Sequence, residues 1–220
     1  MRATATAERQ PTQRQTPQEK ALAEAMAAGV RQAVIDAIVR NGREMPGDRP
    51  ALTVERAPVA IAPAQLALAH PAGKPRDEAQ QLYERCLAYY RGTVRAQDEA
   101  RGIDDVGAAV AAFVGANLCA LQGGTVTLPL LLKLEHQLAG IVRLSADWDS
   151  APARDRQAYF EQMAVIAVLI TETAAQAARQ GQVAVANVQR AARGYLQQLL
   201  GIDPDDLVIG PDGLAARQGS

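Results

Sequence analysis

Proline and glycine divide most of this chain into segments in which apolar residues recur every three or four positions. That spacing places apolar side chains on one face of an α-helix, and proline favours the first turn of a helix whereas glycine favours its end. Aromatic residues make up only 4% of the 220 residues, far from the mix that β-sheets prefer. The pattern predicts an all-α fold, with helices at residues 17–41, 76 to about 96, 105–121, 128–144, 152–180 and 183–200.

The last five of these helices, within residues 76–201, are joined by short connections and predict a compact, alanine-rich bundle. Helix 105–121 should lie at its centre, because Asn117 is its only strongly polar side chain after Asp105. The apolar run from Met163 to Ile170 is too short to span a membrane and should be core. Small residues allow helix axes to approach closely; we expect such contacts at Gly107, Ala108, Ala111, Gly115, Ala164, Ala167, Ala191 and Gly194.

The residues before the bundle are predicted to differ from it. Residues 1–16 lack an apolar period, which is typical of a disordered tail. The next helix is amphipathic, with an apolar stripe from Leu22 to Ile38. Repeated prolines then exclude a long helix or a central strand. The chain is thus divided into a tail at 1–16, an amphipathic helix at 17–41, a proline-rich connector at 42–75 and a helical bundle domain at 76–216.

Short elements are expected at two further places. Within the connector, residues 52–62 should be extended and residues 63–70 should form one or two helical turns. Near the C-terminus, residues 207–209 should form a short strand before the turn Pro211-Asp212-Gly213.

Charge and hydropathy exclude several classes of partner. The 23 basic and 24 acidic residues give a formal net charge of −1, so the chain lacks the positive field that gathers nucleic acid. No apolar run reaches the roughly 18 residues of a spanning helix, which predicts no transmembrane segment. No apolar core of a secretory signal precedes Ala21, which predicts a cytoplasmic protein unless a signal was removed.

Three motifs occur in a characteristic order. They are IDDVGAAVAAF at residues 103–113, YFEQMAVI at 159–166, and NVQRAARGYLQQLL at 187–200 followed by DPDDLVI. Together they resemble an uncharacterised proteobacterial domain family of unknown function, over roughly residues 76–216. Members of that family often carry signal peptides, so the resemblance implies an exported helical protein, periplasmic or secreted. It assigns no catalytic or ligand-binding residue.

The titratable residues predict neither a catalytic site nor a cofactor or metal site. His70 and His136 lack the i, i+3 or i+4 partners of a helical zinc site, and His136 should be a surface or partly buried residue. Helices 76–96 and 105–121 should form an antiparallel hairpin through Gly102, which brings Cys86 and Cys119 to similar heights. Whether the two thiols bond depends on which way Cys119 faces.

Acidic residues are expected to cap helices and turns. Asp104 can cap helix 105–121, with Asp105 beside it at the positive end of the helix dipole. Arg193 is expected to pair with an acid such as Glu161. The acidic set Asp203, Asp205 and Asp206 lacks the spacing of a calcium loop and should serve a turn.

Five polar or aromatic residues on the predicted helices are candidates for a ligand cleft inside the bundle. The alternative is a purely structural role, in which each tyrosine ring packs in the core and its hydroxyl finds a partner at the edge of the core. They are Tyr83, Tyr90, Asn117, Tyr159 and Tyr195.

Three functional hypotheses from different classes follow from the sequence. The absence of recognisable chemistry and the amphipathic helix 17–41 favour a non-enzymatic helical interaction or structural protein, which contacts a protein partner or a second copy through that helix. The alternative is a module that binds a small molecule or lipid in the bundle cleft. The third hypothesis is an enzyme whose active site has no recognisable motif.

Overall fold

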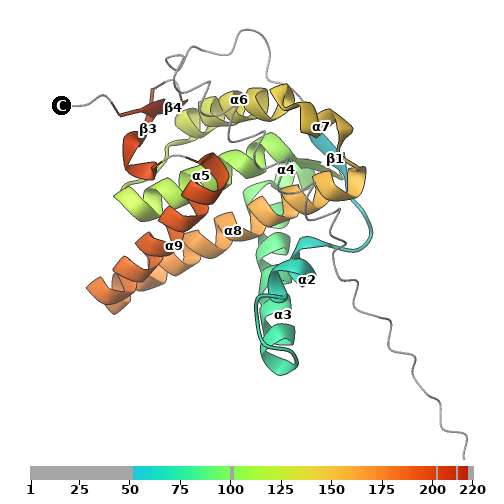
Figure 1. Ribbon diagram of the computed structural model, residues 1–220, viewed down its shortest axis with the longest axis horizontal. Coiled ribbons are helices and arrows are strands. Elements are labelled where there is room, and N and C mark those ends of the chain that lie inside the picture. The colour runs from blue at the N-terminus through green and yellow to red at the C-terminus, as the bar shows by residue number, and fades with distance from the viewer. Residues whose placement is uncertain (1–51, 100–101, 202, 212, 218–220) are drawn as a thin grey trace, which may run out of the picture.

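The computed structural model describes residues 52–99, 102–201, 203–211 and 213–217 (Figure 1). The predicted tail at 1–16 and the predicted helix at 17–41 lie outside the described residues. The described chain is mostly helical, as predicted. Its elements in order are β1 (Thr53–Glu55), α2 (Ala62–Ala67), α3 (Lys74–Tyr89), the π-helix η1 (Tyr90–Val94), α4 (Ala96–Glu99), β2 (Ile103–Asp105), α5 (Val106–Gln122), α6 (Leu128–Leu144), α7 (Ala146–Ser150), α8 (Ala153–Gln180), α9 (Gln182–Leu200), the 3₁₀-helix η2 (Pro204–Asp206), β3 (Leu207–Gly210) and β4 (Gly213–Ala216).

Helix α5 forms the centre of the bundle, as predicted. It packs against α6, α8 and α9, and Figure 1 shows it between α6 on one side and the pair α8 and α9 on the other. Eleven of its 17 residues are buried, including Phe113 and Asn117. Such a helix is apolar nearly all round, because it has a neighbour on almost every side.

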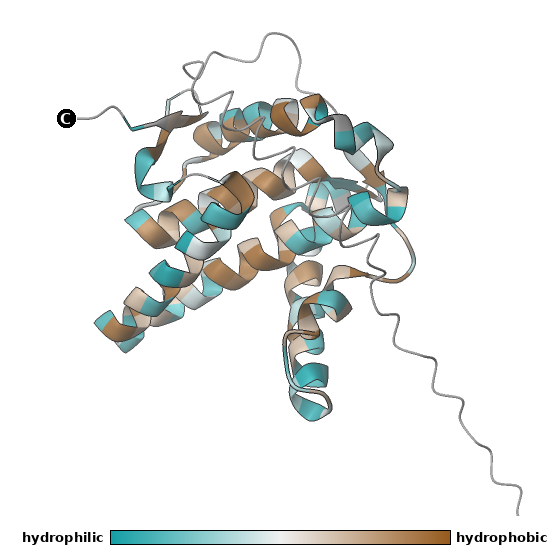
Figure 2. Ribbon diagram, in the orientation of Figure 1, coloured by the Kyte–Doolittle hydropathy of each residue, from teal (hydrophilic) through white to brown (hydrophobic). Residues whose placement is uncertain are grey.

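Helix α8 supplies the other half of the core. Met163, Val165 and Ile170 are buried, which confirms the core position of the apolar run, and the middle of α8 is coloured as hydrophobic in Figure 2. By length and composition alone α8 could cross a membrane, but half of its apolar window is buried inside the bundle. The core helix of a soluble protein meets the same length and composition test.

Small residues bring α5 and α6 into close contact. A Cβ atom added to Gly107 would lie 2.7 Å from the Cβ of Ala139 on α6, so the axes approach as closely as glycine allows. Ala164 on α8 is also fully buried, as expected. The expectation was wrong for α9, where Ala191 and Gly194 face solvent and nothing lies within 4 Å of a Cβ built on Gly194.

The predicted second helix is interrupted. It begins as α3, continues as the π-helix η1 from Tyr90, and ends in α4. In η1 the N–H of Arg95 donates to the carbonyl oxygen of Tyr90 at 2.8 Å. The extra residue in the π turn shifts the side chains that follow. Val94, four residues after the buried Tyr90, is exposed.

Helices α3 and α5 do not form the predicted hairpin. Helix α3 packs mainly against α2 and α8, because β2 intervenes before α5. Cys86 and Cys119 are both free, and burial raises the pKa of each thiol.

Two small antiparallel ribbons complete the fold. Strand β1 pairs with β2 in the register Thr53 with Asp105, and β3 pairs with β4 across the predicted turn. The expected extended and helical parts of the connector are confirmed as β1 and α2. From Leu52 onward this connector is part of the core, since Leu52, Val54 and Ala67 are buried. We call residues 52–70 the strap.

Candidate functional site

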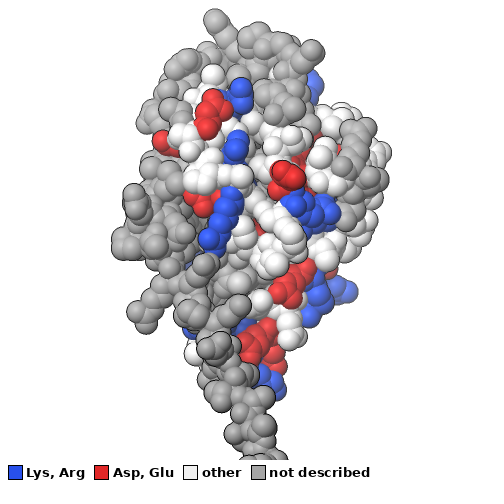
Figure 3. Space-filling view, turned by 90° about the vertical axis from the view of Figure 1, so that its right-hand side faces the viewer, with Lys and Arg blue, Asp and Glu red and all other residues white. Residues whose placement is uncertain are grey.

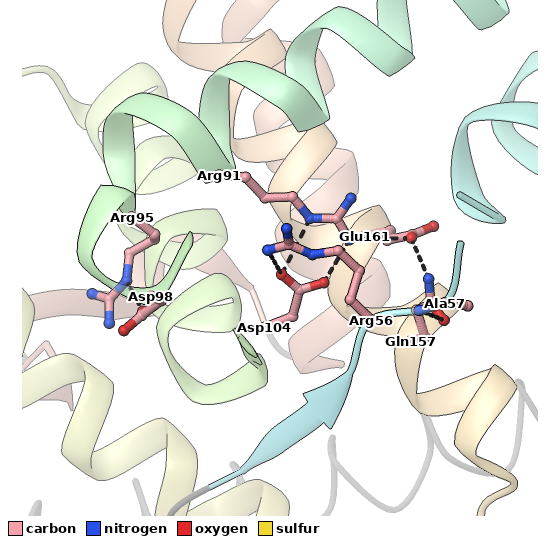
Figure 4. Close-up of polar contacts among 8 residues, drawn as sticks. All are labelled: Arg56, Ala57, Arg91, Arg95, Asp98, Asp104, Gln157 and Glu161. Atoms are coloured by element: carbon pink, nitrogen blue, oxygen red, sulfur yellow. Dashed lines mark hydrogen bonds and ion pairs between the residues drawn. The ribbon is translucent and has the colours of Figure 1, made fainter. Parts of the chain in front are cut away.

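Buried charges gather where the strap meets the bundle (Figure 4). Asp104 on β2 accepts hydrogen bonds from two arginines that converge on it. Arg56 Nη2, just after β1, donates to Asp104 Oδ1 at 3.0 Å, and Arg91 Nε, on η1, donates to the same oxygen at 3.1 Å while Arg91 Nη2 donates to Oδ2. The Asp104 side chain is 1% exposed. One carboxylate therefore joins the strap, the π-helix and β2.

Glu161 on α8 extends this chain of charges to the start of α2. Arg91 Nη2 donates to Glu161 Oε1 at 3.3 Å, and Glu161 Oε2 accepts the backbone N–H groups of Ile61 at 2.6 Å and Ala62 at 2.9 Å. No side chain of α2 itself caps its N-terminus. The carboxylate of a residue far along the chain supplies that cap instead, and its negative charge suits the positive end of the helix.

Gln157, one helical turn before Glu161, holds the preceding part of the strap. Its Oε1 accepts the backbone N–H of Ala57 at 3.1 Å, and its Nε2 donates to Glu161 Oε1 at 2.7 Å. Both polar side chains on this buried face of α8 are therefore used to bind strap backbone. The charges alternate along Glu161, Arg91, Asp104 and Arg56, so they neutralise one another within the network, as buried charges require. We call these four residues with Gln157 the strap network.

The π-helix connects the strap network to a second ion-pair cluster. Arg95 Nη1 donates to Glu135 on α6 at 2.9 Å, and Arg95 Nε donates to Asp98 on α4 at 2.7 Å. Burial opposes the charge on Arg95, but the two carboxylates outweigh it and hold the pKa of the guanidinium above its ordinary value. Through Arg91 and Arg95, η1 is tied to α8, β2, α4 and α6.

Between the two clusters lies a cleft of about 10 Å³, room for roughly one water molecule. Tyr90 borders it, packed edge-on against Phe160. The Tyr90 hydroxyl is buried and has no hydrogen-bond partner among the described residues, and burial raises the pKa of this phenol. The remaining wall is charged: Arg56, Arg91, Arg95, Asp98, Asp104 and Asp105, with Ile103.

The structure distributes the five predicted cleft residues over several elements. Tyr90 alone among them borders this cleft. The hydroxyl oxygen of Tyr83 on α3 lies 3.0 Å from His70 Nε2. Tyr195 on α9 packs edge-on against Phe113.

Of the remaining two candidates, Asn117 is fully buried and Tyr159 is partly buried. Asn117 Nδ2 donates to the carbonyl of Phe113 at 2.8 Å while its Oδ1 has no partner among the described residues. The buried Tyr159 hydroxyl likewise has none, and burial raises the pKa of that phenol.

Several expected roles of acidic residues are corrected by the structure. Asp105, not Asp104, caps α5, since its side chain accepts the N–H of Ala108 at 3.0 Å. The helix begins one residue later than expected, because Asp104 belongs to β2. Arg193 pairs with Asp203 and Asp205 rather than with Glu161, which lies buried in the strap network.

Two other expectations about polar residues are confirmed. Asp203 serves a turn, as predicted, by accepting the N–H of Asp205. His136 is partly buried.

Sequence reasoning missed the strap network. One signal was present: Gln157 and Glu161 share the helical spacing of Ala164, Val165 and Val168, and a carboxylate on an apolar face requires a buried partner. The identity of that partner had no signal, because Arg91 is 70 residues away and Ile61 is 100 residues away.

The arrangement is suited to fixing the backbone. The side chains of Asp104 and Glu161 are 1% and 0% exposed, and their oxygens accept hydrogen bonds from arginine, from Gln157 or from backbone. Among the described residues no group of three or more His, Cys, Asp or Glu could hold a metal ion.

Comparison with known protein families gives a match over almost the whole chain. Residues 1–217 match a family of unknown function (DUF6683), so the similarity includes the N-terminal residues as well as residues 76–216. No curated protein and no solved structure matches the chain.

Proposed function

We propose that this chain, which belongs to the family of unknown function (DUF6683), is a non-enzymatic helical interaction protein in which residues 17–41 are the contact segment. In this proposal the apolar stripe from Leu22 to Ile38 binds a protein surface, and the bundle is the rigid anchor.

The observation that carries the proposal is the strap network. Glu161, Gln157 and Asp104 bind the strap at Ile61, Ala62, Ala57 and Arg56, so the chain is fixed to the bundle from Leu52 onward. Only ten residues, 42–51, separate that anchored point from the predicted helix. A short connection to a rigid body keeps a binding segment at high local concentration near the surfaces it can reach.

The surface charge agrees with a protein partner rather than nucleic acid. On the face drawn in Figure 3, the described basic and acidic side chains alternate with uncharged ones. This face therefore lacks the extended positive potential that attracts the phosphates of a nucleic acid.

Stripe substitutions in the full-length chain test the proposal. Val30→Glu with Val34→Glu should lower the solution mass if the stripe binds a second copy, and should lower the melting temperature if the stripe binds the same chain. Either contact buries apolar side chains, and a charged glutamate is costly to bury there. Gln32→Glu, on the polar side of the same segment, is the matched control. If neither mass nor melting temperature differs from the control, residues 17–41 make no contact in the isolated protein and the proposal fails.

A ligand-binding module is the second candidate, and a specific observation favours it. Three of the five predicted cleft residues, Tyr90, Asn117 and Tyr159, carry a buried polar atom without a partner among the described residues, and such atoms normally find one. A ligand of the native state must raise the melting temperature. A thermal-shift screen of metabolites, lipids and metal ions would support this candidate if the shift disappears in the Asn117→Leu or Tyr159→Phe variant.

A further inference from the structure

Helix α3 is the least covered of the long helices. Only Ala79, Cys86 and Leu87 of its 16 residues are buried, against eleven of 17 in α5. In Figure 1, α3 projects from the body of the bundle with α2 alongside it. Isolated helices of this length are marginal in water and depend on tertiary packing.

An exposed apolar stripe runs along α3 and continues into η1. Leu82 is 39% exposed, Tyr89 48% and Val94 47%. Residues 82 and 89 are two turns of α-helix apart, and residues 89 and 94 are related by the i to i+5 step of a π-helix, so the three side chains share a side. We call these three residues the α3 stripe; it is about 18 Å long at the usual helical rise.

We propose that the α3 stripe is the docking site for residues 17–41 of the same chain. The inference rests on the proposed function for the contact role of that segment, and it goes further by naming the surface and placing both on one molecule. The predicted stripe from Leu22 to Ile38 extends over about 24 Å as a helix, so it is long enough to cover the α3 stripe.

The path of the chain favours this occupant. Leu52, the first described residue, accepts the N–H of Val106. Four residues later Arg56 shares the carboxylate of Asp104 with Arg91, which lies on η1 between Tyr89 and Val94. Arg56 therefore lies near the η1 end of the α3 stripe, and Leu52 lies four extended residues, about 13 Å, from Arg56 along β1.

The connection is long enough for the segment to reach the stripe. Residues 42–51 can span at most about 35 Å, which exceeds the length of the α3 stripe. A tether this short gives a local concentration on the order of millimolar, so a contact within one molecule is favoured over the same contact between dilute molecules.

Cysteine cross-linking in the full-length chain tests the docking. The native cysteines are first removed by Cys86→Ala and Cys119→Ala. Leu82→Cys is then paired in turn with Met26→Cys, Val30→Cys and Val34→Cys. Each variant is oxidised and analysed by non-reducing electrophoresis and mass spectrometry. The control replaces Leu82→Cys by Leu128→Cys on α6, where the side chain is 67% exposed. We expect a disulfide within the monomer at residue 82, formed about tenfold faster than at residue 128.

A second measurement needs no cysteine. The double substitution Leu82→Asp with Tyr89→Asp introduces negative charge at two exposed positions and creates no new trypsin site. If the segment docks there, its cleavage after Arg31 should become about tenfold faster, because cleavage follows the undocked population. Leu128→Asp with Leu132→Asp on α6, both exposed in the native chain, should leave the rate unchanged.

The outcomes separate this inference from the proposed function. A disulfide-linked dimer through residue 82 would overturn docking within one chain while retaining the contact role of residues 17–41. Equal cross-linking at residues 82 and 128, or no cross-linking with unchanged trypsin cleavage, would overturn the α3 stripe as the site. If the Val30→Glu, Val34→Glu variant also matches its control in mass and melting temperature, the proposed function fails with it.

Discussion

Asp104 is a carboxylate whose side chain is 1% exposed, and its charge is balanced by two guanidinium groups from different parts of the chain. Arg56 is 48 residues before it and Arg91 is 13 residues before it. Replacing a buried ion pair by apolar residues is often harmless, whereas removing one partner leaves an uncompensated buried charge. The individual residues of the strap network are therefore expected to be far more sensitive than exposed ion pairs.

Asp104→Asn tests this sensitivity. The substitution keeps the shape of the side chain but leaves Arg56 and Arg91 without their shared counter-charge, and we expect it to lower the free energy of unfolding by about 3–5 kcal/mol. Glu78→Gln removes one partner of the exposed pair Lys74–Glu78 and should change it by no more than about 0.5 kcal/mol. Urea denaturation measures both. Similar losses in the two variants would show that burial of the network contributes nothing special.

Tyr159→Phe concerns a hydroxyl with no partner among the described residues. Removing a buried unpaired polar group should leave stability unchanged or raise it by about 1 kcal/mol at neutral pH. Burial raises the pKa of the Tyr159 phenol, whereas in the unfolded chain it is about 10. The unfolded state therefore releases this proton first, so the contribution to stability is complete below about pH 10 and is lost as pH rises further.

Unfolding measured between about pH 8 and pH 11 should show a smaller alkaline loss in Tyr159→Phe than in the parent protein. Some loss remains in the variant, because burial also raises the pKa of Tyr90. A decrease in neutral-pH stability of more than about 1 kcal/mol would mean instead that the Tyr159 hydroxyl binds something, which would favour the ligand-binding alternative.

At the scale of elements, the sequence predicted the long helices closely and their contacts less well. The bounds of α6 and α9 lie within about one residue of expectation, because proline and glycine act locally on the backbone. The π turn at Tyr90 was not predicted, and it accompanies contacts of Arg91 and Arg95 with carboxylates on α8, β2 and α6. Those carboxylates lie 13 to 70 residues away, a distance over which periodicity carries no information.

Glycine illustrates the same limit, because identical residues on two helices have opposite surroundings. Gly107→Ala puts a methyl group 2.7 Å from the Cβ of Ala139 and should cost about 1–3 kcal/mol of stability, as overpacking does. Gly194→Ala on α9 meets nothing within 4 Å and should stabilise the helix by about 0.5–1 kcal/mol. Thermal unfolding of the two variants should show shifts of opposite sign; equal shifts would mean that the α5–α6 contact is looser than described.

On the scale of the whole molecule, the strap network makes the connector part of the bundle. The sequence indicated a proline-rich connector over residues 42–75, and its part from residue 53 to residue 67 does contain the expected short elements. Composition could not show that their amides are bound from a helix far along the chain, by Gln157 and Glu161. The chain is therefore anchored at Leu52 instead of near residue 76, which shortens the connection to residues 17–41 to ten residues.

Hydrogen exchange can establish whether the strap and the bundle open together. The amides of Ala57, Ile61 and Ala62 donate to Gln157 and Glu161, so in the parent protein they should exchange only through the large-scale unfolding that also releases the α5 amides. Glu161→Gln weakens the charged acceptor at the start of α2 and leaves Arg91 short of one carboxylate. We expect it to lower protection of Ile61 and Ala62 well before that of α5, because the strap then opens locally. Strap amides that already exchange much faster than α5 in the parent protein would show that the network does not fix the strap, and would remove the rigid anchor on which the contact role of residues 17–41 depends.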